Sequence, residues 1–376
     1  MKLLAIQALS AIDYVLFAAV LLISLGIGVF FAILARKVKN AEELLNAAQS
    51  AGLFPVSMSL LASFLSAITL LGTPPMVYET GTMYAWILLS IPIVICAANY
   101  IYIPVFYNCG VSSPYEYLGE RFKCRIMQLL GALVFSFQMV VYMGIVLYVP
   151  CLAIGTVTGI TVWGTGGLKA VLWTDAFQVG IMAASVLMPV IKGSIDHGGF
   201  TNIWNISSEG GRIIFNDGFG LVLALLLSCL SGLVLFAEYG ECNPTRIKGM
   251  VTASDQILPY YVATKFSIAP GSVGIFIAGI VSASLSTVSS GCNSLVAVAF
   301  RDIMDPFFPP LKAQKKMILS KFMGFGFGGL TILFAYLSSF MGAAVQAALG
   351  LFGILAGPLL GIFTLGMLFP FANKYA

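Results

Sequence analysis

The chain has 376 residues, of which 59% are hydrophobic and only 9% are charged. An ordinary soluble domain has about 25% charged residues, so this composition excludes a largely water-facing surface and indicates a protein embedded in a lipid bilayer. The net charge of +4 comes from short basic clusters between apolar segments. Such clusters are typical of membrane topology signals and not of a nucleic-acid-binding surface, so we expect no nucleic-acid partner.

Nine apolar segments approach or exceed the ~20 residues that a bilayer-spanning helix needs. In lipid each segment must satisfy its own backbone hydrogen bonds, and continuous apolar runs disfavour a β-barrel. The segments are 14–35, 54–72, 83–106, 127–150, 168–193, 219–237, 272–300, 321–342 and 343–369. We therefore expect an all-α membrane protein, with residues 1–376 forming a single multi-pass transmembrane domain of about nine helices.

Basic residues cluster after the first, third, seventh and ninth apolar segments. They are Arg36, Lys37, Lys39, Arg121, Lys123, Arg125, Lys312, Lys315, Lys316, Lys321 and Lys374. This pattern predicts cytoplasmic loops after odd-numbered helices and an N-terminus outside. Asn205-Ile206-Ser207 is a glycosylation sequon that favours the outside, whereas helix counting places Asn205 inside. The topology of residues 156–218 therefore stays open.

The second segment ends in Gly72-Thr73-Pro74-Pro75. Two adjacent prolines remove two backbone donors and stop or kink a helix. One interpretation is a break at membrane depth, where freed carbonyls line a cavity as they do in transporters. The other is that the prolines simply end a span near the interface.

Residues 279–294 include eight hydroxyl or amide side chains in sixteen positions. Ala283, Ser286, Thr287 and Ser290 recur at three- and four-residue steps and therefore share a helix face. Uncharged oxygens of this kind suit an alkali cation such as sodium. The alternative is that small and hydroxyl residues let neighbouring helices pack closely and hydrogen-bond to one another.

A similar small and polar face runs along the second segment, through Ser59, Ala62, Ser66 and Thr69, with the same alternative of close packing. Asp175 is the acid that lies most clearly inside an apolar segment. An ionisable group there is costly and by default marks an ion or proton path, unless it pairs with Lys169 at the membrane surface.

The sequence contains no recognisable catalytic set. His197 is the single histidine, the seven cysteines are scattered, and no GK[ST] phosphate loop is present. We therefore do not expect an enzyme or an ATP-driven pump. An ion channel is disfavoured because no carbonyl-rich filter loop stands out.

Six stretches resemble the sodium:solute symporter family. They are FPVSMSLLASFLSAITLLGTP (54–74), SSPYEYLGERF (112–122), VVYMGIVLYVPCLA (140–153), GGLKAVLWTDAFQVGIM (166–182), SASLSTVSSGCNSLVAVAFRDI (282–303) and FGILAGPLLGIFTLGMLFPFAN (352–373). The resemblance covers nearly the whole chain and is closest to the animal branch of monocarboxylate, multivitamin and iodide cotransporters. It implies a LeuT-like inverted-repeat bundle of ten core helices preceded by one further helix.

The resemblance also implies a function: sodium-coupled symport of a small organic anion, such as a monocarboxylate or a vitamin, across the plasma membrane. Sodium is the implied coupling ion, bound between the second and seventh segments. Its implied ligands are the backbone carbonyls of Ala62, Leu65 and Ala283 and the hydroxyls of Ser286 and Thr287. Family positions that face the substrate or a second ion match Ser66, Thr69, Tyr142 and Phe352. An acid on the sodium exit path matches Asp175.

The chain departs from the family pattern at two internal places. Only Thr165 separates Gly164 from Gly166 where the family has its fourth core helix, and Asn216-Asp217-Gly218 stands where the sixth is expected. The family's C-terminal helices also have no counterpart. We therefore expect a bundle that lacks these helices and has an open wall at its substrate pocket. The alternative function is a transport-inactive truncated isoform or gene-model fragment of such a symporter.

Overall fold

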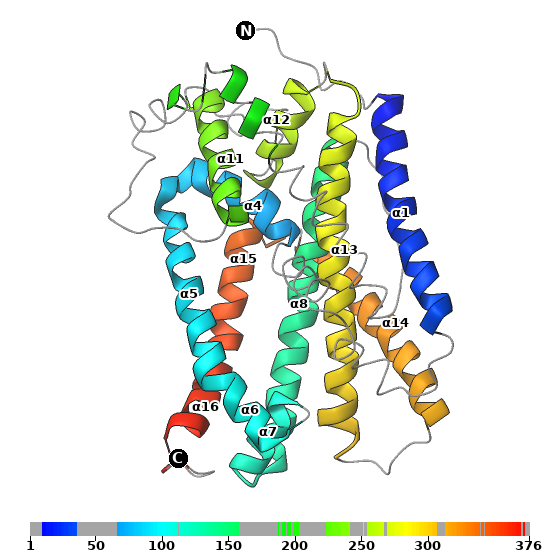
Figure 1. Cartoon of the computed structure of the whole chain (residues 1–376), viewed down its shortest axis with the longest axis vertical. Coiled ribbons are helices and arrows are strands. Elements are labelled where there is room, and N and C mark those ends of the chain that lie inside the picture. Colours follow the sequence, from blue (N-terminus) through cyan, green and yellow to red (C-terminus); the bar gives the residue numbers. More distant parts are fainter. Residues whose placement is uncertain are drawn as a thin grey trace.

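The computed structural model describes residues 10–35, 66–111, 113–157, 187, 190–192, 194–196, 199, 201–202, 223–240, 251, 254–266, 269–306, 313–338, 340–341, 343–369 and 371–372. Within these ranges every long element is a helix, and most helices run along one common axis (Figure 1). The longer helices are α1 (Ala11–Ala35), α8 (Arg125–Val157), α11 (Leu223–Tyr239), α13 (Ser272–Val298) and α14 (Ala313–Ser338).

The remaining elements are shorter. The α-helices are α4 (Ala67–Thr80), α5 (Ile87–Ala97), α6 (Ile103–Cys109), α7 (Pro114–Arg121), α12 (Ile257–Lys265), α15 (Ala344–Leu351) and α16 (Gly357–Leu368). Two 3₁₀ segments are η2 (Gly81–Trp86) and η5 (Ser254–Gln256), and three π-helical segments are η3 (Ala98–Tyr102), η6 (Ala299–Met304) and η7 (Phe352–Ala356). π-Helical turns occur often at functional sites, and η7 begins at the predicted substrate-facing Phe352.

Five helical stretches among the described residues are long and apolar enough to cross a membrane. They are Ser90–Cys109, Arg125–Cys151, Ser272–Met304, Ile318–Ser338 and Ala344–Leu368. Two shorter apolar helices, Ala11–Ser24 and Leu227–Tyr239, match the first and sixth predicted segments. The all-α prediction is therefore confirmed for the part of the chain that the structure describes. Residues 54–65 and most of 168–193 lie outside that part.

The helices meet where small residues allow close approach. A Cβ placed on Gly144 of α8 would come within 2.7 Å of the backbone of Phe334 on α14. Gly291 of α13 lies in the same way against the sulfur of Met143 on α8. Small residues at helix crossings are typical of membrane bundles, because packing replaces the hydrophobic effect there.

Two basic clusters lie at one end of the bundle. Arg121, Lys123 and Arg125 stand at the α7–α8 turn, and Lys315 and Lys316 stand at the start of α14. Both elements lie at the lower end of Figure 1, opposite α12. This placement agrees with the predicted common side for the basic loops. The basic residues after α1 and at the C-terminus lie outside the described residues.

Of the two interpretations of the prolines, the one in which they end the span is wrong, because α4 passes through Pro74 and Pro75 and ends at Thr80. The prolines leave the carbonyls of Leu70 and Leu71 without their usual intrahelical donors. Both prolines are buried, and a Cβ on Gly232 of α11 would lie 2.7 Å from the Pro74 carbonyl oxygen. Packing against α11 therefore outweighs the local tendency of proline to end a helix.

Candidate functional site

The start of α4 lies inside the protein. Ser66, the residue before the helix, is 1% exposed and has extended backbone angles (φ −75°, ψ 164°). Its side chain does not cap the helix. The first N–H groups of a helix have no intrahelical acceptor, and they carry the positive end of its dipole. A buried, uncapped helix start of this kind favours a bound anion.

Tyr142 and Phe352, both predicted to face the substrate, come together in the structure. Their ring centroids are 5.0 Å apart and their planes are tilted by 59°. The Ser66 side chain lies near the Tyr142 hydroxyl. Phe352 remains 39% exposed, so its ring is not fully covered by the described residues. Thr69, in the first turn of α4, is half-buried.

The predicted sodium ligands on α13 are buried on one helix face. Ala283, Ser286 and Thr287 are at most 6% exposed. The Thr287 hydroxyl donates to the carbonyl of Ala283 at 3.0 Å, so two proposed ligand oxygens already lie side by side. The Thr287 oxygen keeps lone pairs that can bind a cation. α13 contacts α4, the helix that follows the other proposed ligands.

The structure shows the packing role of the hydroxyl-rich segment directly and leaves one of its hydroxyls unpartnered. Ser284 donates to the carbonyl of Val146 on α8 at 3.0 Å, which is a packing contact between helices. The hydroxyl of Ser282 is buried and has no hydrogen-bond partner among the described residues. A buried polar atom without a partner is rare and calls for an explanation such as an ion or a water. Ser282 lies one turn from Ser286, on the same face.

The donor set fits a monovalent cation. The oxygens of Ala283, Ser286 and Thr287 are uncharged, and no cluster of three or more His, Cys, Asp or Glu occurs within the described ranges. Such clusters hold divalent and transition metals. The other predicted site residues, Ala62, Leu65, Asp175 and the sequon residue Asn205, lie outside the described residues.

The sequence did not single out an acidic group at the opposite end of the bundle from the basic clusters. Asp255 in η5 is 3% exposed and accepts a hydrogen bond from the backbone N–H of Ala344, the first residue of α15, at 2.9 Å. The neighbouring Ser254 donates to Glu79 near the end of α4. A possible signal was present: Asp255 directly precedes an apolar stretch without any basic partner nearby in sequence.

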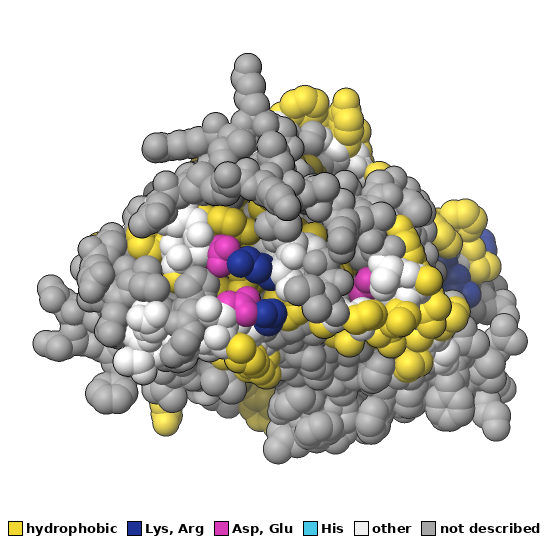
Figure 2. All heavy atoms as spheres, turned by 90° about the horizontal axis from the view of Figure 1, so that it is seen from above, with side chains coloured by type: hydrophobic (Ala, Val, Ile, Leu, Met, Phe, Trp, Pro, Cys, Tyr) yellow, Lys and Arg dark blue, Asp and Glu magenta, His cyan; other side chains and the backbone are white. Residues whose placement is uncertain are grey.

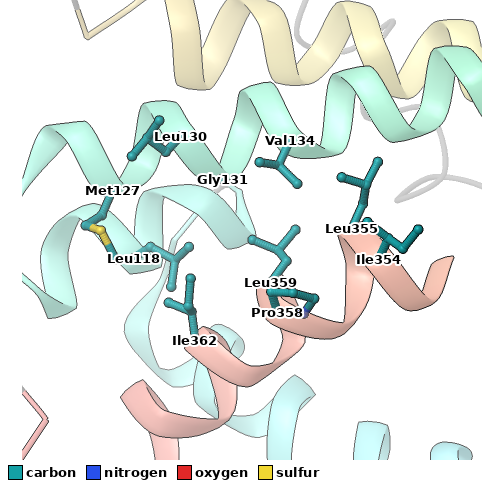
Figure 3. Close-up of a pocket in the computed structure, with 10 residues that line it drawn as sticks. All are labelled: Leu118, Met127, Leu130, Gly131, Val134, Ile354, Leu355, Pro358, Leu359 and Ile362. Atoms are coloured by element: carbon teal, nitrogen blue, oxygen red, sulfur yellow. The ribbon is translucent and has the colours of Figure 1, made fainter. Parts of the chain in front are cut away.

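An apolar groove of about 210 Å³ opens between α7, α8 and α16 (Figure 3). Its ten lining residues are Leu118, Met127, Leu130, Gly131, Val134, Ile354, Leu355, Pro358, Leu359 and Ile362. No side chain in this set can bind a cation or a carboxylate, and an unpaired charge would be costly there. The groove is therefore distinct from the candidate solute site beside Tyr142 and Phe352.

Comparison with solved structures supports the fold. A structure described as the substrate-bound outward-open state of a Na⁺-coupled sialic acid symporter superposes with a TM-score of 0.80. The match covers 97% of this chain and 88% of that chain at 21% sequence identity. At this identity the match establishes the LeuT-like helical bundle and no more.

Comparison of sequences identifies the family. The model of the sodium:solute symporter family matches residues 45–209. Sodium-coupled monocarboxylate transporter 1 of Mus musculus is 36% identical over 428 residues, covering 96% of this chain and 70% of the relative. The sodium-dependent multivitamin transporter of Oryctolagus cuniculus is also 36% identical, covering 97% of this chain and 67% of the relative. The chain belongs to the sodium:solute symporter family.

Proposed function

We propose that this protein uses the sodium gradient to carry a small organic anion, of the monocarboxylate or carboxylate-vitamin class, across the plasma membrane. The observation that supports this most directly is the buried start of α4 beside Tyr142 and Phe352. A carboxylate at Ser66 would accept hydrogen bonds from N–H groups of the first turn, which have no intrahelical acceptor. The aromatic pair would cover the apolar part of the solute.

Sodium would bind on the adjacent face of α13. Ala283, Ser286 and Thr287 would supply oxygens there, and Ala62 and Leu65 would complete the site from the other side. Each ligand would then favour the conformation that the other ligand needs, so sodium and solute would raise each other's affinity. Asp175 is proposed to lie on the path by which sodium leaves. The names of the related monocarboxylate and multivitamin transporters support the proposed solute class.

Uptake into proteoliposomes tests the function. The purified chain is reconstituted, and the entry of radiolabelled lactate or biotin is followed with a sodium gradient and with a matched potassium gradient. Saturable uptake that needs sodium is expected for at least one of the two probes. Uptake that is equal in both gradients and does not saturate would instead indicate a pore.

A transport-inactive form is the second candidate. The alignment with the Mus musculus relative extends over 428 residues, which a 376-residue chain cannot fill, so that relative has internal residues with no counterpart here. This agrees with the expected loss of two core helices. If the chain reaches the membrane and is folded but shows no sodium-dependent uptake while the Mus musculus relative transports in parallel, this second candidate stands.

A further inference from the structure

A short buried segment covers one end of the bundle. The outer lid, defined here as residues 254–265, consists of η5 and α12. Seven of the nine residues of α12 are buried, and α12 contacts α4, α8, α11 and α13. Figure 1 places α12 at the end opposite the basic α7–α8 turn. The lid therefore lies at the end that the basic clusters predict to face outward.

Polar contacts fasten the lid at both ends. At its start, Ser254 bonds to Glu79 of α4 and Asp255 to Ala344 of α15. At its end, the Lys265 ammonium lies 2.7 Å from a carboxylate oxygen of Glu238 at the end of α11. Figure 2 views the molecule from this end and shows acidic and basic side chains side by side.

The contact made by Asp255 leads to the helix that carries Phe352. Ala344 is the first residue of α15, and its N–H is one that the helix itself cannot satisfy. α15 then leads without a break into η7, whose first residue is Phe352. Along the same helix, Val345 lies against Gly72 of α4. Asp255 thus joins the lid to the helix that places Phe352 beside Tyr142.

We propose that Asp255 is a positioning residue for transport: its hydrogen bond to Ala344 latches the outer lid onto α15 and so controls how readily the solute site opens to the outside. The role in transport rests on the proposed function, whereas the latch itself does not. Breaking the hydrogen bond should open the lid more often, even when no solute is transported.

The rate at which a buried cysteine reacts measures the opening directly. Ala348, one turn before Phe352, is 5% exposed, so we expect Ala348→Cys to react with a membrane-impermeant thiol reagent only when α15 moves away from the elements packed around it, as release of the latch would allow. Labelling of the peptide that contains residue 348 is followed by mass spectrometry, which separates it from the native cysteines. Thr80→Cys, at the exposed end of α4, serves as the reference for reagent access.

Two different changes remove the same hydrogen bond. Asp255→Ala removes the acceptor. Ala344→Pro removes the donor. Proline is well tolerated there, because Ala344 is the first residue of α15 and the preceding Ala343 already has the extended backbone that a following proline requires. Both variants should speed labelling of residue 348 by about tenfold, as expected when one hydrogen bond to a charged group is lost. The reference at residue 80 should not change.

Two further variants exclude a merely structural effect. Asp255→Asn keeps an oxygen that can accept from Ala344, so its labelling should be no faster than in the unchanged protein. Asp305→Ala removes an exposed acid at the other end of the bundle, paired with Lys316, and should leave labelling unchanged. Labelling that is unaffected by both Asp255→Ala and Ala344→Pro overturns the latch, and so does an Asn variant that labels as fast as the Ala variant.

The outcome separates the latch from the proposed function. If the labelling responds as expected while the unchanged protein takes up no solute, the latch stands and the transport proposal fails. If sodium-dependent uptake is present but the labelling rate is the same in both bond-breaking variants as in the unchanged protein, the transport proposal stands and the latch fails.

Discussion

The carboxylate of Asp13, in the first turn of α1, accepts a hydrogen bond from the backbone N–H of Gly274, in the first turn of α13, at 2.9 Å. The same carboxylate accepts from the backbone N–H and the hydroxyl of Ser10, so it also closes the start of its own helix. A negative charge at a helix N-terminus is stabilising, and here one aspartate serves two helices. α13 is the helix that holds the proposed sodium ligands.

Asp13→Ala should therefore lower the stability of the protein by about 1–3 kcal/mol, because it leaves buried donors on both helices without an acceptor. Thermal unfolding in detergent micelles measures this. Asp305→Ala, which breaks the exposed ion pair with Lys316, is the control and should cost at most about 1 kcal/mol. Equal losses in the two variants would contradict the dual capping role.

Ser286→Ala combined with Thr287→Ala should raise the sodium concentration needed for half-maximal uptake, because two proposed ligand oxygens are lost. Ser284→Ala is a matched control on the same helix: it removes the bond to Val146 on α8 and should affect stability instead of sodium dependence. Sodium titrations of solute uptake give the measurement. An unchanged sodium requirement in the double variant would falsify the site on α13.

Tyr142→Phe should weaken solute binding without disturbing packing, since the ring against Phe352 is kept and only the hydroxyl near Ser66 is lost. Phe352→Leu should weaken it further, by about two- to tenfold in KM, because an aromatic contact contributes about 0.5–1.5 kcal/mol. Initial rates over a range of solute concentrations test both. Variants with normal membrane abundance and unchanged KM would place the solute elsewhere.

Acid on the outer side should hold the lid closed. Burial raises the pKa of Asp255 above its usual value, and the nearby charge of Glu79 acts in the same direction, while the hydrogen bond from Ala344 opposes it. Within the described part of the chain, the titratable groups that interact with Asp255 are Glu79 and Tyr148. A pKa raised only in the closed state means that proton binding stabilises closure. This stabilisation is complete below the ordinary aspartate value of about 3.9 and is lost as the pH rises through the raised value.

Labelling of Ala348→Cys, corrected for the reactivity of Thr80→Cys, should accordingly slow as the external pH falls from about 7 to about 5. Asp255→Asn has no proton to gain and should remove this pH dependence. If the labelling rate of the Asn variant still depends on pH, a different group causes this dependence, and Glu79 is the first to examine.

The helical architecture was predictable because lipid leaves few options. Continuous apolar runs must be helices, and the segments around α8, α13 and α16 were predicted within a few residues. The course of α4 was not predictable, because proline propensity is a local property. Burial of Pro74 against Gly232, far along the chain, outweighs it, and the helix start at Ser66 has no side-chain cap to announce it.

The candidate site was predictable only in part. Helical periodicity places Ser286 and Thr287 on one face of the helix. It cannot show that the Ser284 hydroxyl is already hydrogen-bonded to the carbonyl of Val146. Tyr142 and Phe352 were both assigned to the substrate site through family resemblance and not through any local pattern. Asp255 and Asp13 act on partners 89 and 261 residues away, so their sequence neighbourhoods give little sign of what they bind.

The unbroken run from Ala344 to Phe352 works as a lever. Eight helical steps of 1.5 Å separate the two residues by about 12 Å, so a tilt of about 5° at the Asp255 end would move the Phe352 ring by about 1 Å. A displacement of that size would change the contact between the Phe352 and Tyr142 rings. Small movements at the Asp255–Ala344 contact would thus be transmitted to the candidate solute site without any rearrangement in between.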